Sequence, residues 1–363
     1  MSANDYNPFD LTDEEPKRGD FSRPKDGETT YVWKGIEYPR VTDILSIAPG
    51  NHLMSWYAKV ASLRAAAWLV HAGLFTPPVE DPMWAELEKW VDSEAIRVVD
   101  PVEAIKMACD WKFNMREAER YRDHAARVGS LGHHWVYNYA LGVRISESDR
   151  IDWLKAEARN LKLIPKDVIE RYEALGKDLD SVETDLAFHA IPHIDSWLKW
   201  NEVFQPEWIA IGLEAVVINE EESCAGTCDG WAKFHKPAWE KAGMAWPFKD
   251  KSALLTGDLK TGSASKTHLM QVAAYSRSSY IALMGDQSEH PIPESEGMFI
   301  VYTKGVEQAK FKLYAGREAI DDGYDAFCGV NAAYRIMHDL PKCSRIRKLG
   351  AQKEKRGSRG CPF

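Results

Sequence analysis

The chain has 363 residues, a length that fits either one elaborated domain or two packed lobes. Its apolar fraction of 45% and its charged fraction of 28% are typical of a globular protein and exclude a disordered one. A net charge of −9 argues against a protein whose whole surface is basic and binds polyanions without specificity.

Residues 1–28 are polar and contain prolines, and they have no basic segment followed by an apolar one as in a signal peptide. We expect them to form a flexible arm. No apolar run reaches the roughly 18 residues that a membrane helix needs. We therefore expect a cytoplasmic protein, in the host cytoplasm if it is phage-encoded, with no membrane partner. Large residues then alternate over 31–38 around Lys34-Gly35, which predicts a β-hairpin.

Apolar residues recur at helical spacing from residue 52 to residue 200. Pro165 and Pro192 are expected to interrupt the later helices. This pattern predicts a mostly helical region over 29–110 and a helical insertion near 145–200. The expected helices cover 52–72, 84–91, 101–107 and 110–141, with further helices over 149–200.

From residue 207 the pattern favours strands. An order of three strands, a helix and more strands predicts an α/β (α+β) core with a central mixed β-sheet flanked by helices, after a largely helical N-terminal half. We expect this core to span 111–340. The predicted strands cover 208–218, 226–235, 254–260, 297–303 and 309–314, and the predicted helices cover 265–283 and 317–338.

The tail, residues 341–363, is strongly basic, and Glu354 is its one acid. It is either a solvated flexible segment or a segment that contacts phosphates.

Acidic residues interrupt three of the predicted apolar strands. Asp229 and Asp258 lie among apolar neighbours, and Glu214 does so in the preceding strand. Strand interiors disfavour aspartate, and a buried charge must be paired or must bind a metal. Carboxylate oxygens suit Mg²⁺ or Mn²⁺. Two such ions about 3.5–4 Å apart can stabilise the attacking and leaving oxygens of a phosphodiester.

Lys260 lies two residues after Asp258, so both side chains leave the same face of a strand. The two residues form either a structural ion pair or part of a site in which Lys260 orients or deprotonates a water or holds a phosphate. Lys266 lies in the first turn of the helix that is predicted after Gly262, and it is either solvent-exposed or in contact with a nucleic-acid backbone.

Gln271 and Tyr275 are four residues apart and share a helix face. They are either ordinary polar residues of an amphipathic helix or residues that support a phosphate site at its N-terminus. His133 lies four residues after Gly129 in another predicted helix. It becomes a candidate metal ligand only if that helix packs against the acidic residues.

Five short motifs follow one another in the order Gly129/His133, Glu214, Gly226/Asp229, Asp258/Lys260/Thr261/Gly262 and Gln271/Tyr275. This set resembles the RecB-type exonuclease branch of the PD-(D/E)XK nuclease superfamily. The segment 38–45, with Trp56 downstream, is similar to the N-terminal region of bacteriophage-encoded members. Cys228 stands where the superfamily name has a proline.

The resemblance implies a restriction-endonuclease-like core that cleaves DNA with Mg²⁺ or Mn²⁺. It implies His133, Asp229, Asp258 and the backbone carbonyl of Leu259 as metal ligands, together with Glu214. Lys260 would be the catalytic lysine. Gln271, Tyr275, Thr261 and Lys266 would support the site or bind DNA.

Some similar nucleases hold an iron–sulfur cluster on four cysteines, one before the core and three near the C-terminus. Cys109, Cys328, Cys343 and Cys361 have that distribution, but the last three are spaced far more widely than compact clusters use. We expect no cluster.

The sequence thus predicts a metal-dependent deoxyribonuclease, with an exonuclease of recombination, repair or phage DNA processing favoured. Its partners would be linear double- or single-stranded DNA and a recombination or replication protein. The alternatives are a structure-specific or single-strand endonuclease and a non-catalytic DNA-binding assembly subunit; RNA as the substrate also stays open. The sequence has no phosphate-binding loop of the helicase type.

Overall fold

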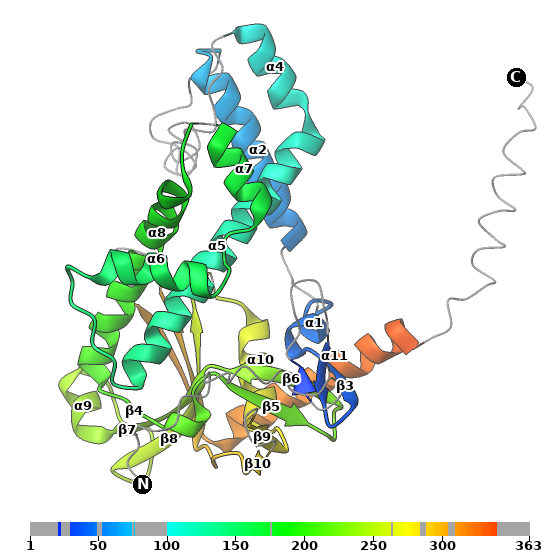
Figure 1. Ribbon diagram of the computed structural model, residues 1–363. Helices are drawn as coiled ribbons and strands as arrows, with labels where there is room; N and C mark the ends of the chain where they lie inside the picture. The colour runs from blue at the N-terminus through cyan, green and yellow to red at the C-terminus, as the bar shows by residue number, and fades with distance from the viewer. Residues whose placement is uncertain are drawn as a thin grey trace, which may run out of the picture.

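The computed structural model describes residues 21–22, 30–48, 53–74, 76, 100–174, 176–262, 264–283, 288–303 and 309–339. These residues form a mixed α/β structure in which helices flank a mixed sheet and a group of helices extends away from the sheets (Figure 1). The predicted α/β class, with a mixed central sheet and flanking helices, is confirmed.

The central sheet has five strands in the order β12-β11-β8-β7-β4. β8 and β11 are parallel, and all other neighbours in this sheet are antiparallel. A parallel pair needs a long crossover, and helix α10 lies within the crossover from β8 to β11. The strands are β4 (Glu207–Trp208), β7 (Gly230–His235), β8 (Ser252–Lys260), β11 (Gly297–Tyr302) and β12 (Lys310–Ala315).

Helices cover both faces of this sheet. Successive residues of β11 face opposite sides, as the geometry of a strand requires. Phe299 and Val301 pack with α5, α6 and α8, whereas Met298 and Ile300 pack with α10 and α11. The helices are α5 (Trp111–Ala140), α6 (Arg150–Asn160), α8 (Leu179–Phe204), α9 (Lys236–Lys241), α10 (Lys266–Ser276) and α11 (Arg317–Asp339).

A second sheet has four antiparallel strands in the order β10-β9-β5-β6, and a three-stranded sheet, β1-β2-β3, packs on it through aromatic residues. The β2–β3 hairpin turns at Lys34 and Gly35, both with positive φ, so the hairpin predicted over 31–38 is confirmed. The elements are β1 (Phe21–Ser22), β2 (Thr30–Trp33), β3 (Ile36–Pro39), α1 (Val41–Leu45), β5 (Ala215–Asn219), β6 (Cys224–Cys228), β9 (Tyr280–Ala282) and β10 (Glu289–His290).

Helix α5 connects the helical group to the sheets (Figure 1). Its first half packs against α2 (Leu53–His71) and α4 (Pro101–Cys109), and its second half packs against α8 and the central sheet. Buried Glu117 forms ion pairs with Arg64 of α2 at 3.0 Å and with Arg171 of α7 (Lys166–Ala174) at 3.1 Å. The carboxylate thereby ties three helices together.

Pro192 does not interrupt a helix as expected, because it lies inside α8. A proline in a helix interior removes one backbone hydrogen bond and crowds the preceding turn. Buried residues on both sides of it, Ala187 and Ala190 before and Ile194 and Trp197 after, belong to one apolar cluster. Burial of this continuous face outweighs the local preference of proline.

Two predicted strands and one predicted helix are also corrected. The expected strand over 208–218 is β4, a short 3₁₀ helix (Ala210–Gly212) and β5, and the expected strand over 226–235 is β6 followed by β7 of the other sheet. The helix expected over 265–283 ends at Ser276, because residues 280–282 pair with β5 as β9. Main-chain pairing with distant strands decides these boundaries, and local propensity does not record it.

Some expectations lie outside the described residues: the helix over 84–91, the basic tail 341–363, and the arm 1–28 except Phe21–Ser22, which pairs with β2. Residues 30–48 pack on the second sheet. The domain boundaries remain a prediction. Among the described helices, none has both the length and the apolar character needed to cross a membrane.

Candidate metal and catalytic site

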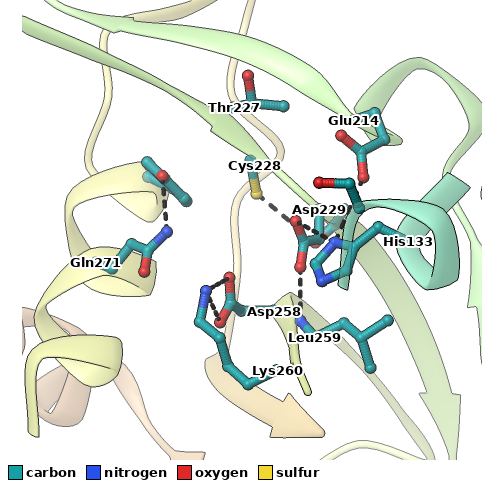
Figure 2. Close-up of polar contacts among 12 residues, drawn as sticks. His133, Glu214, Thr227, Cys228, Asp229, Asp258, Leu259, Lys260 and Gln271 are labelled. Carbon is teal, nitrogen blue, oxygen red and sulfur yellow. Dashed lines mark hydrogen bonds and ion pairs between the residues drawn. The ribbon is translucent and has the colours of Figure 1, made fainter. Parts of the chain in front are cut away.

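Four of the predicted site residues gather where α5 meets the junctions of the two sheets (Figure 2). His133 comes from α5, Glu214 from the turn before β5, Asp229 from the junction of β6 and β7, and Asp258 from β8. Four segments that are remote from one another in the sequence therefore meet at one point. Helix α5 packs against the central sheet. This packing is the condition under which His133 is a candidate metal ligand.

The imidazole of His133 faces two carboxylates. Its Nδ1 lies 3.4 Å from Oδ1 of Asp229 and 3.7 Å from Oε1 of Glu214. One ligand atom from each of the three residues lies within 4.8 Å of the other two. Burial lowers the pKa of His133, but the two carboxylates outweigh burial and raise it to about 10. The imidazole therefore interacts with both carboxylates.

The sequence predicts Asp229 inside a strand. That prediction is wrong, because Asp229 lies between two strands of different sheets. The chain leaves the second sheet at Cys228 and enters the central sheet at Gly230, so Asp229 is placed at the line where the sheets separate. Its Oδ2 accepts a 2.6 Å hydrogen bond from the backbone N–H of Leu259. Burial raises the pKa of Asp229, but His133, Lys260 and this hydrogen bond lower it overall.

Glu214 is also predicted inside a strand, but it lies just outside one, because β5 begins one residue later. Its φ of 47° lies in the left-handed region that residues other than glycine seldom adopt. The backbone N–H of Glu214 donates to the carbonyl of Asp229 at 3.2 Å, which joins the two turns. Strained backbone of this kind concentrates at functional sites.

Asp258 and Lys260 leave the same face of β8, as predicted. The Nζ atom of Lys260 lies 2.9 Å from Oδ1 and 2.8 Å from Oδ2 of Asp258. The Asp258 side chain is only 1% exposed, whereas that of Lys260 is 21% exposed. Burial and the charge of Asp229 raise the pKa of Asp258 to about 7 even though Lys260 opposes the shift. Burial lowers the pKa of Lys260, but the two carboxylates raise it overall.

All four residues line a cavity of about 20 Å³. A space of this size holds a single water-sized group. Apolar residues, which include Trp197 and Phe299, also line the cavity. The side chains of His133, Glu214 and Asp229 are 23%, 23% and 18% exposed, so solvent reaches them, whereas Asp258 forms the buried end.

Gln271 and Tyr275 share a face of α10, and the Gln271 amide donates to the Tyr275 hydroxyl at 2.9 Å. Gln271 lies on the far side of Asp258 from His133 (Figure 2). A Cβ atom on Gly226 would approach the Tyr275 ring to 2.5 Å, so the tyrosine packs directly on β6. Tyr275 therefore supports strand β6, Gln271 holds the Tyr275 hydroxyl, and neither residue lines the cavity.

Thr261 and Lys266 have different environments. The Thr261 side chain lies 3.0 Å from where a Cβ of Gly129 would be, so this glycine lets α5 approach the end of β8. Lys266 is exposed at the first turn of α10, after Ser265, whose hydroxyl caps the helix. Contact of either residue with a nucleic acid remains a prediction.

The structure separates the two adjacent histidines of α5. His133 faces Glu214 and Asp229, whereas Nε2 of His134 lies 2.7 Å from Glu157 of α6 and its ring stacks on Trp153. The Leu259 backbone contributes its N–H to Asp229, and its side chain lines the cavity. The predicted role of the Leu259 carbonyl as a ligand remains a prediction.

Two further residues near the site do not belong to any of the sequence motifs. Tyr137 lines the cavity four residues after His133, and that helical spacing was a usable signal. Tyr31 of the hairpin hydrogen-bonds Thr227 at 2.9 Å, two residues before Asp229. Nothing local in the sequence indicates this second contact, because the two residues are far apart in the chain.

Two of the four cysteines that have the distribution of a cluster lie in separate helices. Cys109 is exposed in α4, which packs on α2 and α5, and Cys328 is in α11, which packs on α10. Cys343 and Cys361 lie outside the described residues.

No protein-family model and no curated protein matches this chain.

Proposed function

We propose that the protein is a Mg²⁺- or Mn²⁺-dependent nuclease that hydrolyses DNA phosphodiester bonds, with a restriction-endonuclease-like core. The observation that carries the proposal is one cavity lined by His133, Glu214, Asp229 and Asp258, with Lys260 paired to Asp258. The resemblance to RecB-type nucleases favours an exonuclease acting in recombination, repair or phage DNA processing.

The residues of the cavity fit a hard divalent cation. Three carboxylates supply oxygen ligands and His133 supplies one nitrogen, a set that Mn²⁺ and Mg²⁺ accept. Asp229 and Glu214 approach His133 closely enough for all three to contact one ion after small shifts. When bound, the cation would polarise the phosphate and make a bound water more acidic.

The remaining groups would position the metal ligands and stabilise negative charge on the phosphate. The Leu259 N–H holds one oxygen of Asp229, which leaves the other directed at His133. Lys260 holds a positive charge beside Asp258 and is partly exposed, so it can bind a phosphate oxygen as negative charge develops there. The apolar residues that line the cavity would limit the number of waters around these groups.

The decisive experiment is cleavage of end-labelled linear DNA with Mg²⁺, Mn²⁺ or EDTA. Asp258→Asn and Lys260→Ala should each lower the rate by about 10²-fold or more, the usual effect of removing one electrostatic group. Asp250→Asn and Lys251→Ala are matched controls, since both residues are exposed just before β8. Unchanged cleavage by pure Asp258→Asn protein would remove the proposal.

Two further substrates separate the alternatives. An exonuclease leaves circular single-stranded DNA whole, whereas an endonuclease using the same site opens it. A non-catalytic DNA-binding subunit would cleave neither substrate and would show no Mn²⁺ binding at this site by calorimetry. End-labelled RNA tests the remaining substrate class.

A further inference from the structure

A second group of potential ligands lies on α5 and α8, away from the cavity. Nε2 of His124 lies 3.1 Å from Nδ1 of His189, and that nitrogen lies 3.6 Å from Oδ2 of Asp185. One ligand atom of each residue lies within 4.8 Å of the other two. Asp185 and His189 are one turn apart on α8, so they share a face that is directed at α5.

These spacings are close to those around a four-coordinate ion. With bonds of about 2.0–2.1 Å, two ligand atoms of a tetrahedral zinc site are about 3.3 Å apart. The observed 3.1 and 3.6 Å lie on either side of this value. The two imidazole rings meet edge to face at 87°, so their ring nitrogens converge rather than their faces.

Another contact fixes the carboxylate. The hydroxyl of Tyr172, on α7, donates to Oδ2 of Asp185 at 3.1 Å. Metal-binding carboxylates are commonly oriented by such outer hydrogen bonds. The side chains of Asp185 and His189 are 39% and 57% exposed, so an ion can enter directly from solvent.

We propose that His124, Asp185 and His189 form a second metal site, which takes a four-coordinate transition metal ion such as Zn²⁺ and fastens α5 to α8. Two imidazoles and one carboxylate are zinc ligands, and water would complete the set. His124 and His133 are nine residues apart on α5, about 13 Å along the helix axis. That separation is too large for one two-metal centre, in which the ions are about 3.5–4 Å apart.

The site would act on the first one through α5. The two helices pack through Val128 and Leu131 of α5 and Leu186 and Ala190 of α8. An ion held by His124, one turn before Val128 on α5, would add a cross-link between the same helices. The cross-link would limit movement of the helix that carries His133.

The test uses Co²⁺ as a probe, because four-coordinate Co²⁺ absorbs visible light. Full-length protein carrying Asp229→Asn, which removes a ligand of the first site, is stripped with chelator and titrated. We expect one equivalent of Co²⁺ to give a visible band that Zn²⁺ displaces. His189→Ala and His124→Ala in this background should each abolish the band, and Tyr172→Phe should weaken binding about 10-fold.

The matched control is His235→Ala. His235 pairs with Glu207 at 2.9 Å but belongs to no group of three potential ligands among the described residues, so its loss should leave the band unchanged. Circular dichroism of each variant checks that the helices remain folded. A background protein without a visible band, or a band that survives either His124→Ala or His189→Ala, would overturn the proposal.

Discussion

Replacement of Gly226 by alanine should destabilise the protein by crowding Tyr275. The new Cβ atom would lie 2.5 Å from Cε1 and 2.9 Å from the hydroxyl oxygen of the tyrosine, which is 2% exposed. The ring must therefore move by about 1 Å within a packed core, and such overpacking costs about 1–3 kcal/mol. Alanine also lowers the conformational entropy of the unfolded chain relative to glycine, and this effect offsets up to about 1 kcal/mol of the overpacking cost. We expect a net loss of about 1–2 kcal/mol.

Gly132→Ala is the matched control, because its Cβ would meet no atom within 4 Å. It lies inside α5, where alanine is favoured over glycine by about 1 kcal/mol. Urea unfolding of the two variants should thus shift the midpoint in opposite directions. Because Gly226 precedes Asp229 by three residues, Gly226→Ala should also lower Mn²⁺ affinity. A Gly226→Ala protein as stable as the original would refute the packing argument.

Three further outcomes follow from individual residues. Glu214→Gly should stabilise the protein by about 1 kcal/mol relative to Glu214→Ala, because glycine accepts the φ of 47° without strain; both variants should bind Mn²⁺ more weakly in calorimetry. Burial, then the charges of Lys260 and Lys312, lower the pKa of His268 to about 4. Unfolded histidine has a pKa of about 6.5. Between pH 4 and pH 6.5 the unfolded chain therefore binds a proton at His268 that the folded chain does not bind. The unfolding free energy should therefore fall as pH is lowered from 6.5 to 4, and less so in His268→Gln than in a His338→Gln control. Pro192→Ala should raise the unfolding midpoint by restoring a hydrogen bond inside α8; a lower midpoint would contradict that account.

Local sequence signals predicted the elements whose conformation depends on their own residues. The hairpin at Lys34-Gly35 needs positive φ at both turn positions, and the two residues adopt it. The long helix α5 and strand β11 carry the apolar spacing of a helix and of a strand, and both are present with nearly the predicted bounds. The pairing of Lys260 with Asp258 follows from the two-residue period of a strand.

The errors fall where distant packing decides the backbone. The sequence predicts Asp229 inside a strand because Trp231 and Phe234 beside it are apolar. Both residues do lie in β7 of the central sheet, but Cys228 before Asp229 ends β6 of the second sheet, so the chain changes sheet at Asp229. Glu214 was misplaced for the same reason, since Leu213 and Ala215 on either side are buried while the backbone turns between them. Apolar neighbours report burial, but they do not report which sheet provides it.

These two errors explain how the acids meet. An aspartate in the middle of a continuous strand would have its main-chain groups paired with the neighbouring strands, so its main chain could not bond to Glu214. At the point where two sheets diverge, the main chain of Asp229 can bond to Glu214 on one side while its carboxylate reaches Leu259 on the other. His133 then closes the third side from a helix that packs on the central sheet. The departure from regular strand structure is therefore what allows three remote residues to present their ligand atoms to one point.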